Sequence, residues 1–243
     1  MKKYLAILLT LAMCFGMAAC ASAPAEPEEP EEPDIFAKSE GVMTHEEFAA
    51  APAGSEVVVE TFVQAAQAWW DGKLTAYTQD DAGGYFLRDL NCSEEDAALL
   101  VPGAKIKATG TKGEESGEIY IENAVIEFEE GEYIAPAADV TALLGSEDMI
   151  RHQNEYVSFK DMTVSGEAVY KWDGSGADGD DLYFELEKDG GAYTFMVASY
   201  LTGAGTEVYE RVKSLKAGDT VDVEAFCYWY EGIMPHVTGI TKK

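Results

Sequence analysis

The feature that most constrains this chain is a glycine-led strand pattern that occurs twice. After Gly103 the sequence reads Ala-Lys-Ile-Lys-Ala-Thr-Gly, and after Gly218 it reads Asp-Thr-Val-Asp-Val-Glu-Ala. In both segments small or apolar residues alternate with polar ones, which is the period of a half-buried strand. The same number of residues separates Gly103 from Gly218 and Gly117 from Gly232, so two successive turns recur in register. The chain is therefore predicted to contain two copies of one small β domain.

The remaining segments of each copy predict three strands, a short helix and two further strands. The strands are expected at residues 56–64, 73–79, 84–90, 104–110 and 118–128 in the first copy, and at 156–170, 182–186, 192–200, 220–230 and 233–240 in the second. Ser93 and Thr206 are expected to cap the two helices. This order resembles the OB fold, a five-stranded Greek-key barrel. The predicted fold class is mainly β, with two tandem five-stranded OB-like barrels and short connecting helices.

Composition and repeat boundaries divide the chain into five parts. We expect a signal peptide at 1–20, whose closing residues are described below, an acidic proline-rich linker at 21–40, a first OB-like domain with an N-terminal helix at 41–135, a helical linker at 136–153, and a second OB-like domain at 154–243. The linker cannot bury a core and its like charges repel, so an extended spacer is expected.

The N-terminal segment has the pattern of an export signal. Lys2 and Lys3 precede an apolar run too short for a transmembrane helix, and the run closes with Met17-Ala-Ala-Cys20. This closing segment resembles the lipobox of bacterial lipoproteins, which implies cleavage before Cys20 and lipidation of its thiol. The expected location is outside the cell, anchored to the outer face of the membrane. An ordinary signal peptide cleaved near Ala19 is the alternative.

The charge of the chain restricts its partners. Seventeen basic residues face 45 acidic ones, which gives a formal net charge of −28. Binding to phosphate backbones requires clustered lysine or arginine, so nucleic acid is disfavoured as a partner. The same charge disfavours close approach to anionic lipid beyond the proposed anchor.

Cysteine and histidine usage predicts no zinc site. Once Cys14 and Cys20 are set aside with the export signal, Cys92 and Cys227 remain, one in each copy. No Cys-x-x-Cys pair occurs and the three histidines are scattered. We interpret Cys92 and Cys227 as small hydrophobic residues, although a bridge between the copies stays open.

Aromatic residues near the first hairpin of each copy are candidates for a ligand face. Trp-Asp-Gly occurs at the same place in both copies, in the loop between strands one and two, which together with strands two and three lines the ligand surface of many OB folds. The alternative is that the tryptophans pack over the barrel ends. The candidate ligand-binding residues are Trp69, Trp70, Tyr77, Tyr85, Trp172 and Tyr183.

An acidic loop in the second copy partly matches a calcium-binding pattern. The loop fails the EF-hand register, because Asp178 stands where glycine is needed and Phe184 where glutamate is needed. A solvated hairpin loop is favoured, and no cofactor is predicted. A looser calcium site is the weaker alternative, with the ligands Asp173, Asp178, Asp180 and Asp181.

The sequence favours a binding protein over an enzyme. Gly-x-Ser-x-Gly, P-loop and HExxH motifs do not occur, so no catalytic residue is assigned. The predicted function is a non-enzymatic, membrane-anchored module that binds a protein, peptide or glycan. The alternatives are an OB-fold nucleic-acid-binding protein and a hydrolase-associated accessory domain.

Several segments of the mature chain resemble one class of bacterial proteins. The class comprises Gram-positive, gut-type surface lipoproteins built from tandem OB-like domains, and the resemblance brings no defined activity. The segments that carry it are Met43-Thr-His-Glu-Glu-Phe48, Trp69-Trp-Asp-Gly-Lys73, Tyr77-Thr-Gln-Asp80, Gly84-Tyr-Phe86 and Asp139-Val-Thr-Ala-Leu-Leu-Gly145.

The lipobox leads to a first prediction about location. Replacing Cys20 by alanine removes the thiol that would carry the lipid, so we expect an unprocessed precursor or release of the protein from the membrane. Cell fractionation and the mass of the processed chain measure both effects. Normal processing with unchanged membrane retention would refute the lipoprotein assignment.

Overall fold

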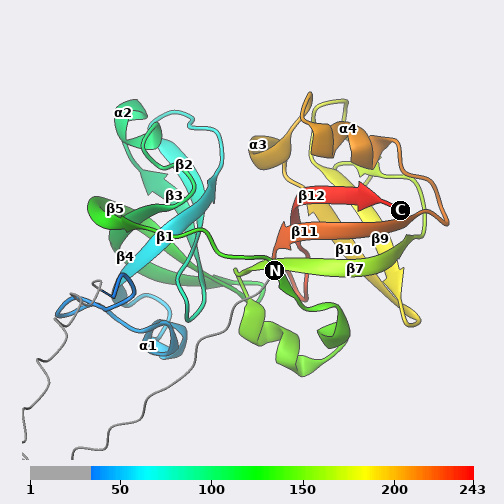
Figure 1. Ribbon diagram of the computed structural model, residues 1–243. Helices are drawn as coiled ribbons and strands as arrows, with labels where there is room; N and C mark the ends of the chain where they lie inside the picture. The colour runs from blue at the N-terminus through cyan, green and yellow to red at the C-terminus, as the bar shows by residue number, and fades with distance from the viewer. Residues whose placement is uncertain (1–33) are drawn as a thin grey trace, which may run out of the picture. The chain divides into compact units, whose positions relative to one another are not determined.

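The computed structural model describes residues 34–243, which form one compact unit. Two β-barrels follow one another in this part of the chain (Figure 1). None of its helices has the length and apolar character needed to cross a membrane. Cys20 and the other predictions for residues 1–33 lie outside the described residues.

Barrel one is a closed five-stranded barrel. Its strands lie in the order β1-β2-β3-β5-β4, and all neighbours are antiparallel except β3 and β5. The helix α2 (Glu94–Ala97) joins β3 to β4, and the side chain of Ser93 caps it as predicted. The strands are β1 (Glu56–Ala66), β2 (Lys73–Gln79), β3 (Gly84–Asn91), β4 (Ala104–Glu115) and β5 (Glu118–Glu132).

Barrel two repeats this arrangement. Its strands lie in the order β7-β11-β12-β10-β9, and an additional pairing of β7 with β9 closes the ring. The helix α4 (Glu207–Lys213), capped by Thr206, joins β10 to β11. The predicted fold class, two tandem five-stranded OB-like barrels, is confirmed. The strands are β7 (Tyr156–Val164), β9 (Leu182–Lys188), β10 (Gly191–Val197), β11 (Thr220–Phe226) and β12 (His236–Lys242).

The repeated glycines hold the same position in both barrels. Gly103 donates its N–H to the carbonyl of Val63 at 2.8 Å, and Gly218 donates to Val164 at 2.8 Å. Both glycines have positive φ angles, +96° and +86°, which other L-residues rarely adopt. Each glycine therefore closes the turn into strand four while bonding to the end of strand one.

The remaining elements are short. The side chains of Thr44 and Glu47 form a capping box at the start of α1 (His45–Ala50). The predicted helical linker contains two 3₁₀-helices instead of α-helices. The elements are β6 (Ala138–Asp139), η1 (Thr141–Leu143), η2 (Glu147–His152), β8 (Val169–Tyr170) and α3 (Ser199–Thr202).

All five predicted strands of the second copy are wrong at an end: the strand predicted at 182–186 continues to Lys188, and the one predicted at 233–240 runs from His236 to Lys242. The strand predicted at 156–170 is two strands, and the break follows Ser165, which still bonds to β9, through its N–H and its hydroxyl to the carbonyl of Glu185. The strand predicted at 192–200 ends at Val197, since the carbonyl of Ala198 accepts the first hydrogen bonds of α3. The strand predicted at 220–230 ends at Phe226.

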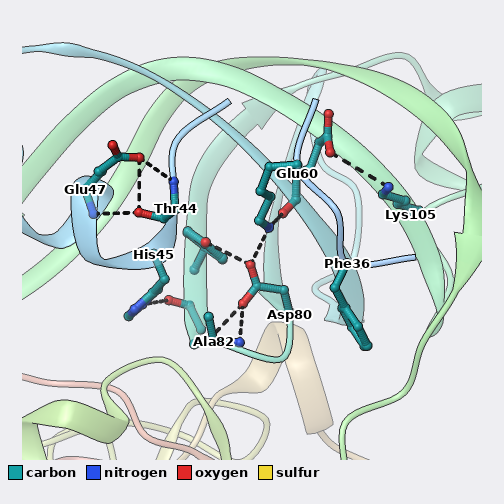
Figure 2. A network of polar contacts seen from close by, with 12 residues as sticks. Phe36, Thr44, His45, Glu47, Glu60, Asp80, Ala82 and Lys105 are labelled. Carbon is teal, nitrogen blue, oxygen red and sulfur yellow. Dashed lines mark hydrogen bonds and ion pairs between the residues drawn. The ribbon is translucent and has the colours of Figure 1, made fainter. Parts of the chain in front are cut away.

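A polar network fastens the described segment before β1, which contains Lys38, to barrel one (Figure 2). The ammonium group of Lys38 lies 2.6 Å from Asp80 Oδ2 and also donates to the carbonyl of Glu60. Asp80 Oδ1 accepts the backbone N–H groups of Ala82 and Gly83. The buried Asp80 carboxylate is thus paired and hydrogen-bonded, which offsets the cost of removing it from water.

An aromatic contact joins the two barrels. The ring of Tyr77 in β2 stacks on Phe226 in β11, with centroids 4.4 Å apart and planes 16° apart. Phe86 and Tyr120 of barrel one complete this buried cluster. Hydrogen bonds surround the rings, for example from the N–H of Tyr156 to Gln79 Oε1 at 2.7 Å. The patch of barrel one that carries Tyr77, Phe86 and Tyr120 is therefore covered by barrel two.

Candidate functional site

Barrel two carries a groove lined by aromatic residues, with a volume of ≈ 990 Å³. The loop before β9, the strands β9 and β10, and the loop between β11 and β12 all border it. It occupies the surface that OB folds commonly use for ligands. The lining residues are Trp172, Tyr183, Ala192, Tyr193, Thr194, Met196, Tyr228, Tyr230, Glu231, Gly232, Ile233, Met234 and His236.

Five aromatic rings line this groove, and two of them are largely open to solvent. Trp172 is 71% exposed and Tyr230 is 55% exposed. Trp172 projects from a turn in which Lys171 has a φ of +59° and its carbonyl accepts the N–H of Gly174. Exposed rings at an OB ligand surface are suited to stacking on a flat partner.

One wall of the groove is the β11–β12 loop, and barrel one holds it in place. Trp229 and Ile233 pair as a short hairpin. The N–H of Trp229 bonds to Glu118 Oε2 at 2.9 Å, and the N–H of Glu231 bonds to the carbonyl of Ser116 at 2.7 Å. Ser116 and Glu118 belong to the β4–β5 hairpin of barrel one, so that hairpin positions the wall of a groove on the other barrel.

His236 forms part of the groove floor and is held as a neutral ring. Its Nδ1 lies 2.7 Å from the hydroxyl of Tyr77, and Gln67 Nε2 donates to that hydroxyl at 3.1 Å. The Tyr77 proton is then directed to Nδ1, which leaves the hydrogen of the neutral imidazole on Nε2. Burial lowers the His236 pKa to about 3, and the ring stacks on Tyr228. Within residues 34–243, Nε2 has no hydrogen-bond partner.

Two residues predicted for the ligand face are buried, so their assignments are wrong. Tyr77 is covered by Phe226 and belongs to the contact between the barrels. Tyr85 points into the core of barrel one, where its hydroxyl donates to Asp80 Oδ2 at 3.0 Å. A tyrosine whose hydroxyl finds an internal partner can be buried as fully as phenylalanine.

The other predicted aromatic residues fall into two separate places. Trp172 and Tyr183 line the groove on barrel two. Trp70 is exposed at the β1–β2 turn of barrel one, where it borders a different hollow of ≈ 330 Å³ together with Tyr200. Trp69 Nε1 donates to the carbonyl of Cys92 at 3.1 Å. The two tryptophan loops therefore line different hollows.

Sequence reasoning missed most of the groove. Tyr193, Tyr228, Tyr230 and Met234 line it but were not among the candidates. The segment Tyr-Trp-Tyr before Glu231 and Gly232 is the signal that could have found them, because consecutive aromatic residues at a hairpin turn cannot all face a barrel core.

The acidic loop does not assemble a calcium site. Asp173 accepts from Ser175, Asp178 pairs with Lys213 at 3.0 Å, Asp180 accepts the N–H of Ala177, and Asp181 accepts the N–H of Ser199. The four carboxylates thus bond to four different places in the loop and its neighbours. Across residues 34–243, no three Asp, Glu, His or Cys residues converge as metal ligands.

Both remaining cysteines are free thiols. Cys92 is half-buried and Cys227 is buried in the core of barrel two. Burial raises the pKa of both thiols, which keeps them protonated at neutral pH.

Comparison with known proteins supplies no family. Neither a protein-family model nor a curated protein matches this chain. Similar solved structures include p202 HIN1 in complex with 12-mer dsDNA, with a TM-score of 0.37, 9% identity, and coverage of 82% of this chain and 100% of that one. A murine DNA-binding protein bound with dsDNA has a TM-score of 0.35 and 12% identity, over 76% of this chain and 97% of that one.

A third similar structure is a Replication Protein A heterotrimer bound to ssDNA. It has a TM-score of 0.33 and 10% identity, over 77% of this chain and 49% of that one. At such TM-scores and identities, none of these similarities carries an inference about what this chain binds.

The support of the groove wall by Glu118 leads to a prediction of pH dependence. Burial raises the pKa of the Glu118 carboxyl from an ordinary value of 4.5 to about 8. Between pH 4.5 and about pH 8, the Glu118 carboxyl is protonated in the folded protein and ionised in the unfolded chain. The free energy of unfolding therefore falls as pH rises through this window, by up to about 1.4 kcal/mol per pH unit for this group.

The variant Glu118→Gln tests this dependence, because glutamine keeps an acceptor for Trp229 and cannot titrate. We expect wild type to lose stability relative to the variant between pH 5 and pH 8, measured by chemical denaturation. The exposed Glu114→Gln is the control and should leave the pH profile unchanged. A difference between wild type and Glu118→Gln that stays constant with pH would show that Glu118 is ionised throughout.

Proposed function

We propose that this protein is a non-enzymatic binding module that uses the groove on barrel two for a protein, peptide or glycan ligand. The observation that carries the proposal is the groove lining, in which five aromatic rings surround a hollow large enough for a chain-like ligand. The lipobox at Cys20 supports the further proposal of an anchor on the outer face of the membrane.

The groove chemistry favours a ligand without negative charge. Its only carboxylate is Glu231, its imidazole is neutral, and no lysine or arginine lines it among the described residues. Burial raises the pKa of the Tyr228 hydroxyl to about 12, so this group stays uncharged and can donate or accept hydrogen bonds. Such a surface can pack on apolar side chains, peptide planes or sugar rings.

Nucleic-acid binding is the second candidate, and one observation favours it. Trp172 and Tyr230 are exposed rings of the kind on which unpaired bases stack. The same site lacks the cations that neutralise phosphates, and that neutralisation supplies most of the affinity of nucleic-acid-binding proteins. We therefore rank this function below a protein, peptide or glycan ligand.

Catalysis in the groove has less support than binding. An enzyme of the hydrolase type needs an acid and base pair or an activated nucleophile. The groove presents one carboxylate and a histidine whose pKa is far below neutrality. A role as a hydrolase-associated accessory domain remains compatible with binding alone.

Two single variants, each of which removes one exposed tryptophan, test the proposed function. The full chain is screened against arrays of peptides, glycans and single-stranded oligonucleotides, and each hit is titrated with two variants. Trp172→Ala removes an exposed ring of the groove, so we expect binding to weaken tenfold or more, which is about 1.4 kcal/mol. Trp70→Ala removes an equally exposed indole on barrel one and should leave binding unchanged.

Equal binding by wild type and Trp172→Ala would place the ligand surface elsewhere. Tight and salt-sensitive binding of oligonucleotides would instead favour the nucleic-acid alternative.

A further inference from the structure

Strand β10 presents a free backbone edge to the groove. Met196 directs its N–H away from β9, since this group bonds to the carbonyl of Pro235. Glu185, which lies opposite Thr194, directs its carbonyl away from β10, because that carbonyl accepts from Ser165. Backbone groups alternate in direction along a strand, so the N–H and C=O groups of Ala192 and Thr194 also point away from β9.

Strand β12 is the neighbour that could pair with this edge, but it runs beside β10 for only one residue pair. Within residues 34–243, β12 pairs with β10 only through His236 and Met196. Before His236 comes Pro235, which has no N–H, and before that Met234 donates its N–H to the carbonyl of Tyr228. The β11–β12 loop thus bonds to itself, and the groove separates it from Ala192 and Thr194.

Barrel one shows what fills the equivalent space. There, too, strand three and strand five pair briefly, at Leu87 with Ile121 and Arg88 with Glu122. On the N-terminal side of that pairing, β3 and β5 are separated by the residues around Asn154, which lead into barrel two. Asn154 Nδ2 donates to the carbonyl of Ile119 at 3.0 Å, and a Cβ on Gly84 would lie 2.2 Å from the carbonyl carbon of Asn154.

We propose that the groove on barrel two captures an extended peptide, which pairs as an added strand with the free edge of β10. This inference rests on the proposed function and names its ligand class. The edge at Ala192 and Thr194 offers N–H and C=O groups in the spacing of a strand, which a polypeptide backbone matches and a sugar or phosphate chain does not.

The groove also defines the side chains that such a peptide should carry. Alternate residues of an added strand face the two sides of the sheet, so one set meets the rings that line the groove. Glu231 at the rim and the net charge of the chain favour neutral or basic residues at the remaining positions. An apolar or aromatic residue at every second position, with lysine or arginine between, is the expected motif.

The test is selection from a phage-displayed library of random linear peptides on the full chain, followed by titration of the selected peptides. Thr194→Pro removes the N–H that points into the groove and leaves the bonds between β10 and β9 intact. Thr194→Ala keeps this N–H and is the matched control. Both variants lose the threonine side chain and only Thr194→Pro loses the N–H, so we expect Thr194→Pro to bind about tenfold or more weakly than Thr194→Ala.

A thermal melt of both variants establishes that each is folded. Methylation of alternate backbone nitrogens of a selected peptide provides a second readout that leaves the protein unchanged, and one set of positions should abolish binding. Failure to enrich any linear peptide, or equal binding by Thr194→Ala and Thr194→Pro, overturns the proposal.

The same variants separate this proposal from the proposed function. If Trp172→Ala weakens binding of a glycan or oligonucleotide while Thr194→Pro does not, the groove is the site and its ligand is not a peptide strand. If neither variant affects any ligand, the groove is not the site and both proposals fail.

Discussion

The arrangement of this molecule depends on the brief parallel pairing between the third and fifth strands of each barrel. A barrel removes most free strand edges, but in this fold the two strands meet for one or two residues and then diverge. Backbone groups beside that divergence need a partner, since an unpaired buried amide costs free energy comparable to a lost hydrogen bond. Barrel one meets this need with Asn154 from the chain that leads to barrel two.

The contact between the barrels follows from the same constraint. Once Asn154 lies beside β3 and β5, Phe226 is placed against Tyr77, and the β4–β5 hairpin reaches the loop that carries Tyr228 and Tyr230. Barrel one thereby serves as the support of the groove on barrel two. The burial of Glu118 at this junction explains why its carboxyl favours the protonated form.

The sequence was sufficient for features that depend on local chemistry and on the repeat. Gly103 and Gly218 could be matched because both turns use glycine at a positive φ, and Ser93 and Thr206 revealed two helix starts. The sequence could not show which tyrosines are covered. Tyr77 alternates like a solvent-facing residue, yet its burial depends on Phe226 from the other copy.

Alternating amide exchange along β10 tests the central claim most directly, because it reports the free edge without any ligand. The N–H groups of Tyr193 and Phe195 point toward β9, while those of Ala192 and Thr194 point into the groove. Native-state hydrogen exchange measured by NMR should therefore show slow exchange at Tyr193 and Phe195 and fast exchange at Ala192 and Thr194. Equal protection of all four amides would contradict the account, because the edge would then already be paired.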